Sequence, residues 1–219
     1  MKRVLLIFIL LSVSVPIAYY YTSKSTQKKL PIINPSELVE DVVDPELRNK
    51  SMGHRVQDFE FVNQNNVLVH SKDLKESIWI VEYFFATCPS ICPIMNVQMQ
   101  RVQEAYRNDD QIKILSFTVD PENDSVAVLK KYADDHHAID QKWHFFTGEK
   151  KALYELARQS FFLLKPAETA NVGDAGGDFI HTNNFVLIDS QKRIRGYYDG
   201  TNPQEVDELI SDIQILKSE

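Results

Sequence analysis

The chain of 219 residues lacks the features that mark several common classes of protein. It has no block of basic residues, and 24 basic against 31 acidic residues give a formal net charge of −7, so nucleic acid is not an expected partner. It contains no internal repeat and no low-complexity tract. Its length allows one sizeable domain with appendages but hardly two full domains.

Cysteine is scarce, since Cys88 and Cys92 are the only two. They lie four residues apart, where an apolar run that predicts a strand passes into a predicted helix. Two thiols at such a point can bind a soft metal ion or cycle between dithiol and disulfide. A purely structural disulfide would close a loop of about five residues and constrain the unfolded chain by only roughly 2 kcal/mol. The pattern therefore favours a functional pair.

Charge is absent from Val4 to Ser23, and a helix of about 20 apolar residues spans roughly 30 Å, the thickness of a bilayer core. Lys2 and Arg3 precede the segment and predict a cytoplasmic tip with an exported body. A cleaved signal peptide is the alternative, but no A-x-A-like cleavage site follows. We expect residues 1–23 to be a single-pass membrane anchor, with the body on the non-cytoplasmic side, at the periplasmic face of a bacterial inner membrane.

The next segment, residues 24–54, is polar, poorly periodic and contains three prolines, so it is expected to be a tether. Residues 55–219 have the pattern of an ordered domain. In chain order they predict a hairpin over 59–70, a strand over 78–86, a helix after 93, a strand over 112–119, a helix after 125, a strand over 143–147, a helix from 149, a hairpin over 184–198 and a last helix from 203.

This order predicts an α/β domain with a mostly parallel centre, which is a thioredoxin-like fold with an extra N-terminal β-hairpin. Sites in such sheets collect at the C-terminal ends of the strands, where Cys88, Cys92 and Asp120 are expected. Pro93 should lie in the first turn of its helix, so free N–H groups would face the thiols and lower their pKa. Two thiolates select Cu(I) or Zn(II), and one imidazole would complete a three-coordinate site suited to Cu(I).

His181 is the candidate for that imidazole, because it follows a glycine-rich stretch and immediately precedes the strand of the last hairpin. From spacing alone, a ligand and an ordinary loop histidine remain equally open. The other five histidines are interpreted as ordinary polar residues: His54, His70, His136, His137 and His144.

Three further residues near the cysteines have two interpretations each. Met95 and Met99 could be thioether ligands, but their helical spacing with Val102 favours core packing. Asp120 could influence the thiols or a partner, but a turn and capping role before Pro121 is favoured.

Three motifs together resemble the SCO/SenC family of membrane-anchored, thioredoxin-like copper chaperones of cytochrome c oxidase assembly. They are FxxCPxxCPxM at 85–95, TVDPxxDS at 118–125 and DFIHT at 178–182, within a resemblance that covers about residues 50–217. The resemblance implies copper bound by Cys88, Cys92 and His181 and delivered to the dinuclear copper site of an oxidase subunit. Members of that family often have an acidic residue directly before the histidine, whereas this chain has Ile180, with Asp178 as the nearest acid.

Two alternatives use the same cysteines. A thiol–disulfide reductase would keep the copper-ligand cysteines of the oxidase reduced; it needs Cys88 and Cys92 as a redox pair, and a thiol-reducing partner, but not His181. A peroxidase or redox sensor ranks lower, because the nearest arginine in sequence, Arg101, lies a full helix face away. We therefore expect a copper-binding protein rather than an enzyme.

Overall fold

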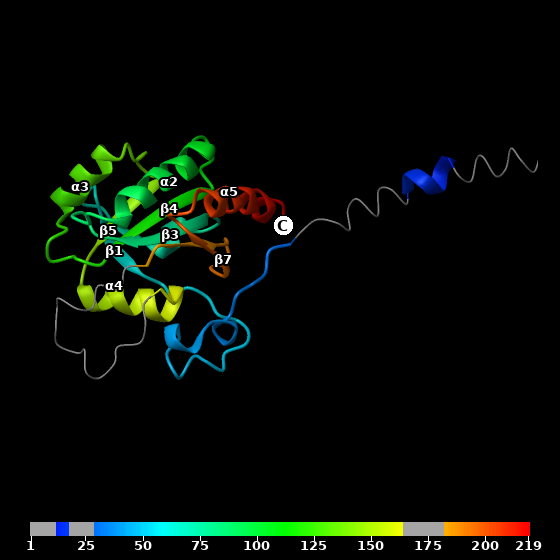
Figure 1. The fold of residues 1–219 in the computed structure, drawn as a ribbon, viewed down its shortest axis with the longest axis horizontal. Helices are drawn as coiled ribbons and strands as arrows, with labels where there is room; N and C mark the ends of the chain where they lie inside the picture. Colours follow the sequence, from blue (N-terminus) through cyan, green and yellow to red (C-terminus); the bar gives the residue numbers. More distant parts are fainter. Residues whose placement is uncertain (1–11, 18–28, 164–181) are drawn as a thin grey trace, which may run out of the picture.

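The computed structural model describes residues 12–17, 29–163 and 182–219. Its centre is a seven-stranded sheet with the order β2-β1-β5-β4-β3-β6-β7 (Figure 1). The strands are β1 (Glu60–Asn63), β2 (Leu68–His70), β3 (Ile78–Phe84), β4 (Ile112–Thr118), β5 (Trp143–Thr147), β6 (Asn184–Ile188) and β7 (Ile194–Asp199). β3, β4 and β5 pair in parallel, and the two hairpins add antiparallel strands at the sides. The prediction of an α/β fold with a parallel centre and an N-terminal hairpin is confirmed.

Helices cover both faces of the sheet (Figure 1). α2 (Ile91–Ala105), α3 (Val126–Asp135) and α5 (Pro203–Ser218) pack on one face, and α4 (Lys150–Leu156) packs on the other. α4 continues into a π-helical turn, Ala157–Phe161, which ends where Phe162 adopts a left-handed conformation. Three short 3₁₀ turns are also present: η1 (Pro35–Glu37), η2 (Glu40–Val42) and η3 (Ser71–Leu74).

The central strand β3 is buried along its whole length, as its nearly unbroken apolar sequence predicts. Ile80 and Phe84 pack into the core under α2, α3 and α5, whereas Trp79 and Val81 pack into the core on the α4 side. The strand ends at Phe84, two residues earlier than expected. The reason is that the Ala86 N–H donates to a side-chain carboxylate instead of to a neighbouring strand.

The prediction that residues 24–54 form a tether is wrong for residues 29–54, which pack against the domain. We call this segment the strap. Leu30 is 5% exposed and Val43 is fully buried, each within one of the two cores. The Ile33 N–H donates to the Ile194 carbonyl at 2.9 Å, which adds a bridge to β7. A few isolated apolar side chains give no periodic pattern, yet their burial binds this polar segment to the domain.

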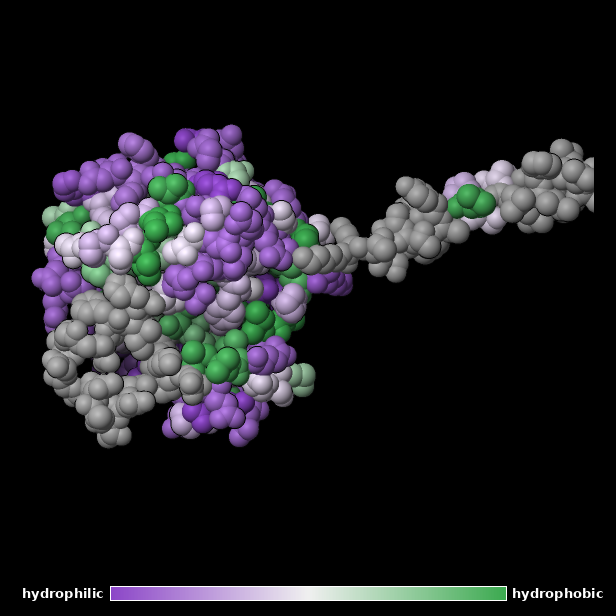
Figure 2. All heavy atoms as spheres, viewed as in Figure 1, coloured by the Kyte–Doolittle hydropathy of each residue, from purple (hydrophilic) through white to green (hydrophobic). Residues whose placement is uncertain are grey.

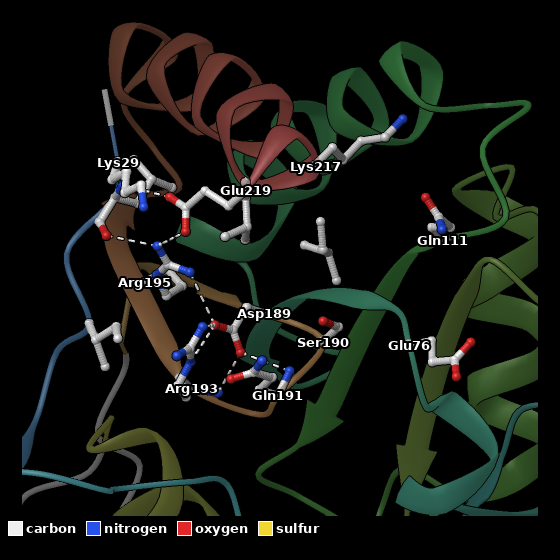
Figure 3. Close-up of a pocket in the computed structure, with 14 residues that line it drawn as sticks. Lys29, Glu76, Gln111, Asp189, Ser190, Gln191, Arg193, Arg195, Lys217 and Glu219 are labelled. Carbon is white, nitrogen blue, oxygen red and sulfur yellow. Dashed lines mark hydrogen bonds and ion pairs between the residues drawn. The ribbon is translucent and has the colours of Figure 1, made fainter. Parts of the chain in front are cut away.

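Arg195 holds the first residues of the strap from inside the domain (Figure 3). Its guanidinium donates to the Pro31 carbonyl at 2.9 Å and to the Leu30 carbonyl at 2.7 Å. It also forms ion pairs with Asp189 at 3.1 Å and with Glu219 at 2.6 Å. Arg195 is only 3% exposed, so its charge and its N–H donors depend on these partners and not on water.

A cavity of about 520 Å³ lies at the start of β3, next to Ile78, and is lined in part by Leu30, Asp189, Arg195 and Glu219. Since β3 is seven residues long, the cavity lies roughly 20 Å from the other end of that strand. The strap therefore joins the domain at the end of the sheet opposite to the cysteines.

Among the described residues, no helix combines the length and the apolar character needed to cross a membrane. The anchor expected over residues 1–23 lies mostly outside the described part of the chain, which includes only residues 12–17 of it.

Candidate metal centre

The two cysteines lie together where β3 leads into α2. Cys88 follows the strand end by four residues, and Cys92 is the second residue of α2. Both are free thiols and almost buried, with exposed fractions of 7% and 4%. The Cys92 S–H donates to the Cys88 sulfur, and the Ser90 hydroxyl lies 3.8 Å from the Cys88 sulfur. Two sulfur donors are thus adjacent, at the C-terminal end of a strand, as the sequence predicts.

The pKa values of the two thiols shift in opposite directions. Burial acts to raise the pKa of Cys88, but hydrogen bonds from the backbone N–H groups of Cys92 and Ser90 outweigh it, so that pKa lies below its ordinary value. Burial raises the pKa of Cys92 far above its ordinary value, and a hydrogen bond with the Phe85 backbone offsets only part of this. The expected effect of the helix N-terminus therefore holds for Cys88 and is wrong for Cys92.

Asp124 fixes the loop that carries Cys88. Its carboxylate accepts hydrogen bonds from the Ala86 N–H, at 3.2 and 3.3 Å, and from the Thr118 hydroxyl. The side chain is 1% exposed and bridges the ends of β3 and β4. The cap of α3 is the next residue, Ser125, whose hydroxyl accepts from the Val128 N–H at 3.4 Å.

Asp120 builds the turn that follows β4. Its carboxylate oxygens accept from the Asn123 side-chain amide at 3.0 and 2.9 Å. Its backbone carbonyl accepts from the N–H groups of Asn123 and Asp124. These contacts support the favoured interpretation of Asp120 as a turn residue.

Met95 and Met99 are core residues, as predicted. They are 1% and 0% exposed and belong to the apolar cluster that also contains Cys88 and Cys92. An apolar surrounding of this kind excludes water from the sulfurs. Two adjacent thiols in it form a donor set suited to a soft metal ion and poorly suited to a hard one.

Several histidines have partners elsewhere in the protein. His54 Nε2 lies 2.9 Å from the Ser160 carbonyl, and His144 Nε2 lies 3.2 Å from the Gln141 carbonyl. His70 pairs with Glu60 at 3.0 Å. Within the ranges that the structure describes, no group of three or more Cys, His, Asp and Glu side chains could hold a metal ion. His181 lies outside these ranges, as does Asp178.

Glu82 is a site residue that sequence reasoning missed. It lies in β3, is 1% exposed and accepts a hydrogen bond from the Ser116 hydroxyl at 2.6 Å. Burial raises the pKa of Glu82 to about 7, and its charge acts to raise the pKa of Cys92. The signal available in the sequence was a single acidic residue inside an otherwise apolar strand.

Comparison with known proteins agrees with this geometry. The family model SCO1/SenC matches residues 48–217. The SCO1 protein homolog of Bacillus subtilis is 30% identical over 167 residues, which cover 74% of this chain and 83% of that protein. A Stutzerimonas stutzeri protein named for copper binding is 26% identical over 144 residues, 65% of this chain and 68% of that protein.

A similar solved structure is that of BsSco, a member of the Sco family of cytochrome c oxidase assembly proteins in which a disulfide switch was identified. It is 28% identical with a TM-score of 0.63, and the match covers 76% of this chain and 95% of that structure. The family match spans most of the chain and includes both cysteines. The chain therefore belongs to the SCO1/SenC family.

Proposed function

We propose that this protein is a copper metallochaperone that matures the dinuclear copper site of cytochrome c oxidase. The observation that carries the proposal is the pair of adjacent, free and nearly buried thiols at the junction of β3 and α2. Cys88, Cys92 and His181 are the proposed ligands. The names of the relatives support this function, since one is named for copper binding and another belongs to a family of oxidase assembly proteins.

The residues around the thiols have different roles in metal binding. Asp124 holds the loop before Cys88, and the N–H groups of Ser90 and Cys92 favour its thiolate. Cys92 holds its proton until a metal ion displaces it, because a thiol must lose its proton to become a ligand. A soft monovalent ion would be held by two sulfurs in an apolar setting, and His181 would supply a nitrogen ligand.

The proposed location is the non-cytoplasmic face of a membrane, at the periplasmic side of a bacterial inner membrane, with residues 1–23 as the anchor. The position of the strap supports this arrangement. Because the strap joins the domain at the end opposite to the cysteines, the thiols would point away from the anchor and towards a client.

The test is X-ray absorption of the full-length chain loaded with one equivalent of Cu(I). Two sulfur ligands and one nitrogen ligand are expected, with the nitrogen lost in His181→Ala. Copper binding should be lost in Cys88→Ser and in Cys92→Ser. His70→Ala is the matched control, because His70 is a surface histidine paired with Glu60. Copper bound at full stoichiometry by the double cysteine variant would overturn the proposal.

A second candidate function, thiol–disulfide reductase, is favoured by the opposite pKa shifts of the two thiols. The Cys88 thiolate would attack a client disulfide, form a mixed disulfide and release one client thiolate. Cys92 would then lose its proton and attack the Cys88 sulfur, which forms the Cys88–Cys92 disulfide and releases the second client thiolate. A thiol-reducing partner would restore the pair. His181→Ala should keep this activity, which separates it from copper delivery.

A further inference from the structure

The strap, residues 29–54, carries the most exposed apolar side chains of the domain. Met52 is 80% exposed and Val39 is 72% exposed, and among the residues that the structure describes no large apolar side chain is more exposed than these two. Ile32, near the start of the strap, is 41% exposed. The same segment buries Leu30 and Val43 in the two cores. The strap therefore has apolar groups on its outer side as well as on the side that packs against the domain.

Met52 and Val39 belong to one part of the strap, although 13 positions separate them in the sequence. The Ser36 N–H donates to the Lys50 carbonyl at 3.3 Å. Val39 follows Ser36 by three positions, and Met52 follows Lys50 by two. The strap thus doubles back on itself and brings its two most exposed apolar side chains into the same region of the surface. Figure 2 shows green, apolar atoms on the side of the domain where the strap runs in Figure 1, with purple hydrophilic atoms beside them.

The start of the strap lies close to the proposed membrane anchor. Only five residues, 24–28, separate that anchor, residues 1–23, from Lys29. A chain covers at most about 3.3–3.6 Å per residue, so Lys29 lies within roughly 20 Å of the end of the anchor. The strap is fixed to the domain by the hydrogen bonds of Arg195 and by its own buried apolar side chains, so it cannot unfold into a longer linker. With residues 1–23 as the anchor, the domain therefore has this end next to the bilayer.

We propose that the outer side of the strap lies on the membrane, with Ile32, Val39 and Met52 inserted at the boundary between lipid headgroups and acyl chains. This proposal rests on the proposed location of the protein, in which residues 1–23 are the anchor. Binding at this boundary grows with the apolar area that a segment buries there. Because the anchor keeps the strap beside the bilayer, even a weak contact would be occupied most of the time. The contact would also stop the domain from turning, so that both cysteines stay directed away from the membrane.

The charges beside these side chains decide which lipid is the suitable probe. Glu40 and Lys50 are both exposed, and Arg48 pairs with Glu40 at 3.6 Å. Charges of both signs therefore accompany the exposed apolar groups, so the contact does not depend on an anionic lipid. Vesicles of phosphatidylcholine, a lipid without net charge, are the appropriate surface for the test.

The test is the quenching of tryptophan fluorescence by bromine atoms on the acyl chains of phosphatidylcholine, with the full-length chain in vesicles. Trp79 and Trp143, the two natural tryptophans, are buried in the core with exposed fractions of 1% and 0%. The fluorescence that Val39→Trp adds should fall at least twofold in brominated vesicles relative to unbrominated ones. The matched control is Val97→Trp on α2, where the natural side chain is 57% exposed, and its added fluorescence should be unchanged.

A second variant shows whether the natural apolar side chains insert or only the added tryptophan does. Met52→Asp, introduced into Val39→Trp, should reduce the quenching, since a carboxylate at the boundary would have to be desolvated. Leu68→Asp in the same background should leave the quenching unchanged, because Leu68 lies on the edge strand β2 and is 51% exposed. Equal quenching with and without Met52→Asp would mean that the added tryptophan inserts alone, and would overturn the proposal.

The remaining outcomes separate this proposal from the proposed location. Release of the unmodified protein from vesicles by alkaline carbonate would show that it has no membrane-spanning anchor, which overturns the proposed location and this proposal with it. Resistance to carbonate, with no more quenching of Val39→Trp than of Val97→Trp, overturns the membrane contact alone. Emission of Val39→Trp that shifts to shorter wavelength in vesicles without quenching by bromine would show that protein, such as a second copy of the chain, covers the strap, and would also overturn the proposal.

Discussion

The thiols of Cys88 and Cys92 share a hydrogen bond, yet the two residues differ in the direction of their pKa shifts. Cys88 precedes α2 and receives hydrogen bonds from N–H groups at the start of that helix. Cys92 lies inside the first turn, where burial dominates and its S–H serves as the donor to Cys88. Cys88 is therefore the thiol that ionises more readily, and Cys92 stays protonated.

This difference predicts selective alkylation of the reduced, metal-free protein. At pH 7, iodoacetamide should modify Cys88 before Cys92, because the thiolate is the nucleophile and only the pKa of Cys88 is lowered. As the pH rises, Cys88 should reach its full rate at a lower pH than an ordinary cysteine does. Peptide mapping by mass spectrometry at several times measures both sites.

The control for that experiment is Cys92→Ala, which removes the S–H donor while it leaves the N–H donor of the backbone. The pH dependence of Cys88 alkylation should move to higher pH in this variant. Faster modification of Cys92 than of Cys88 in the unmodified protein would contradict the assignment.

The raised pKa of Glu82 predicts that the stability of the protein depends on pH. Its pKa is about 7 in the folded protein, against an ordinary value of 4.5, because burial disfavours the charged form. Its contribution to folding is therefore fully present below about pH 4.5 and is lost as the pH rises through about 7. Between pH 5 and pH 8, the unmodified protein should lose roughly 2–3 kcal/mol more unfolding free energy than Glu82→Gln. Urea unfolding of the reduced, metal-free proteins measures this difference.

Glu82→Gln is a close match in shape, and its amide oxygen can still accept from the Ser116 hydroxyl. Other titrating groups are common to both proteins, so their effects cancel in the comparison. Equal pH dependence of the two proteins would show that Glu82 does not titrate in this range.

Much of the fold follows from local patterns in the sequence. The continuous apolar run of β3 and the helical spacing of Met95 and Met99 each depend only on neighbouring residues, and both predict their structure correctly. The position of the cysteines at the C-terminal end of a strand follows from the same patterns together with the rule for parallel sheets.

The remaining features depend on contacts between distant residues. Asp124 resembles a helix cap in the sequence, but its buried carboxylate bonds to Ala86, which lies 38 positions earlier. Leu30 and Val43 are isolated apolar residues whose partners are far along the chain. The pKa of Cys92 is decided by burial, and burial is not encoded in the spacing of the two cysteines.

The ion pairs of Arg195 predict a large loss of stability in Arg195→Met. The substitution removes one of the two arginine partners of the buried Asp189, together with the hydrogen bonds to the strap carbonyls of Leu30 and Pro31. Breaking a buried pair in this way should cost about 3–5 kcal/mol of unfolding free energy. Limited trypsin digestion should also cut the strap, residues 29–54, faster than in the unmodified protein.

Arg193→Met is the control, because Arg193 also pairs with Asp189 but its side chain is 26% exposed. It should cost less and leave the strap protected. A strap equally resistant to trypsin in Arg195→Met and in the unmodified protein would mean that its apolar residues alone hold it.

Substitutions at Met99 test whether this residue packs in the core or binds the metal. Because its side chain is fully buried, Met99→Ala should lower the unfolding free energy by about 2–5 kcal/mol, whereas Met99→Leu should cost less than about 1.5 kcal/mol. Neither variant should change the copper stoichiometry, since Met99 packs in the core and the proposed sulfur ligands are Cys88 and Cys92. X-ray absorption of copper-loaded Met99→Leu provides the decisive measurement. The number of sulfur ligands should remain that of the unmodified protein, and a lower number would make Met99 a ligand after all.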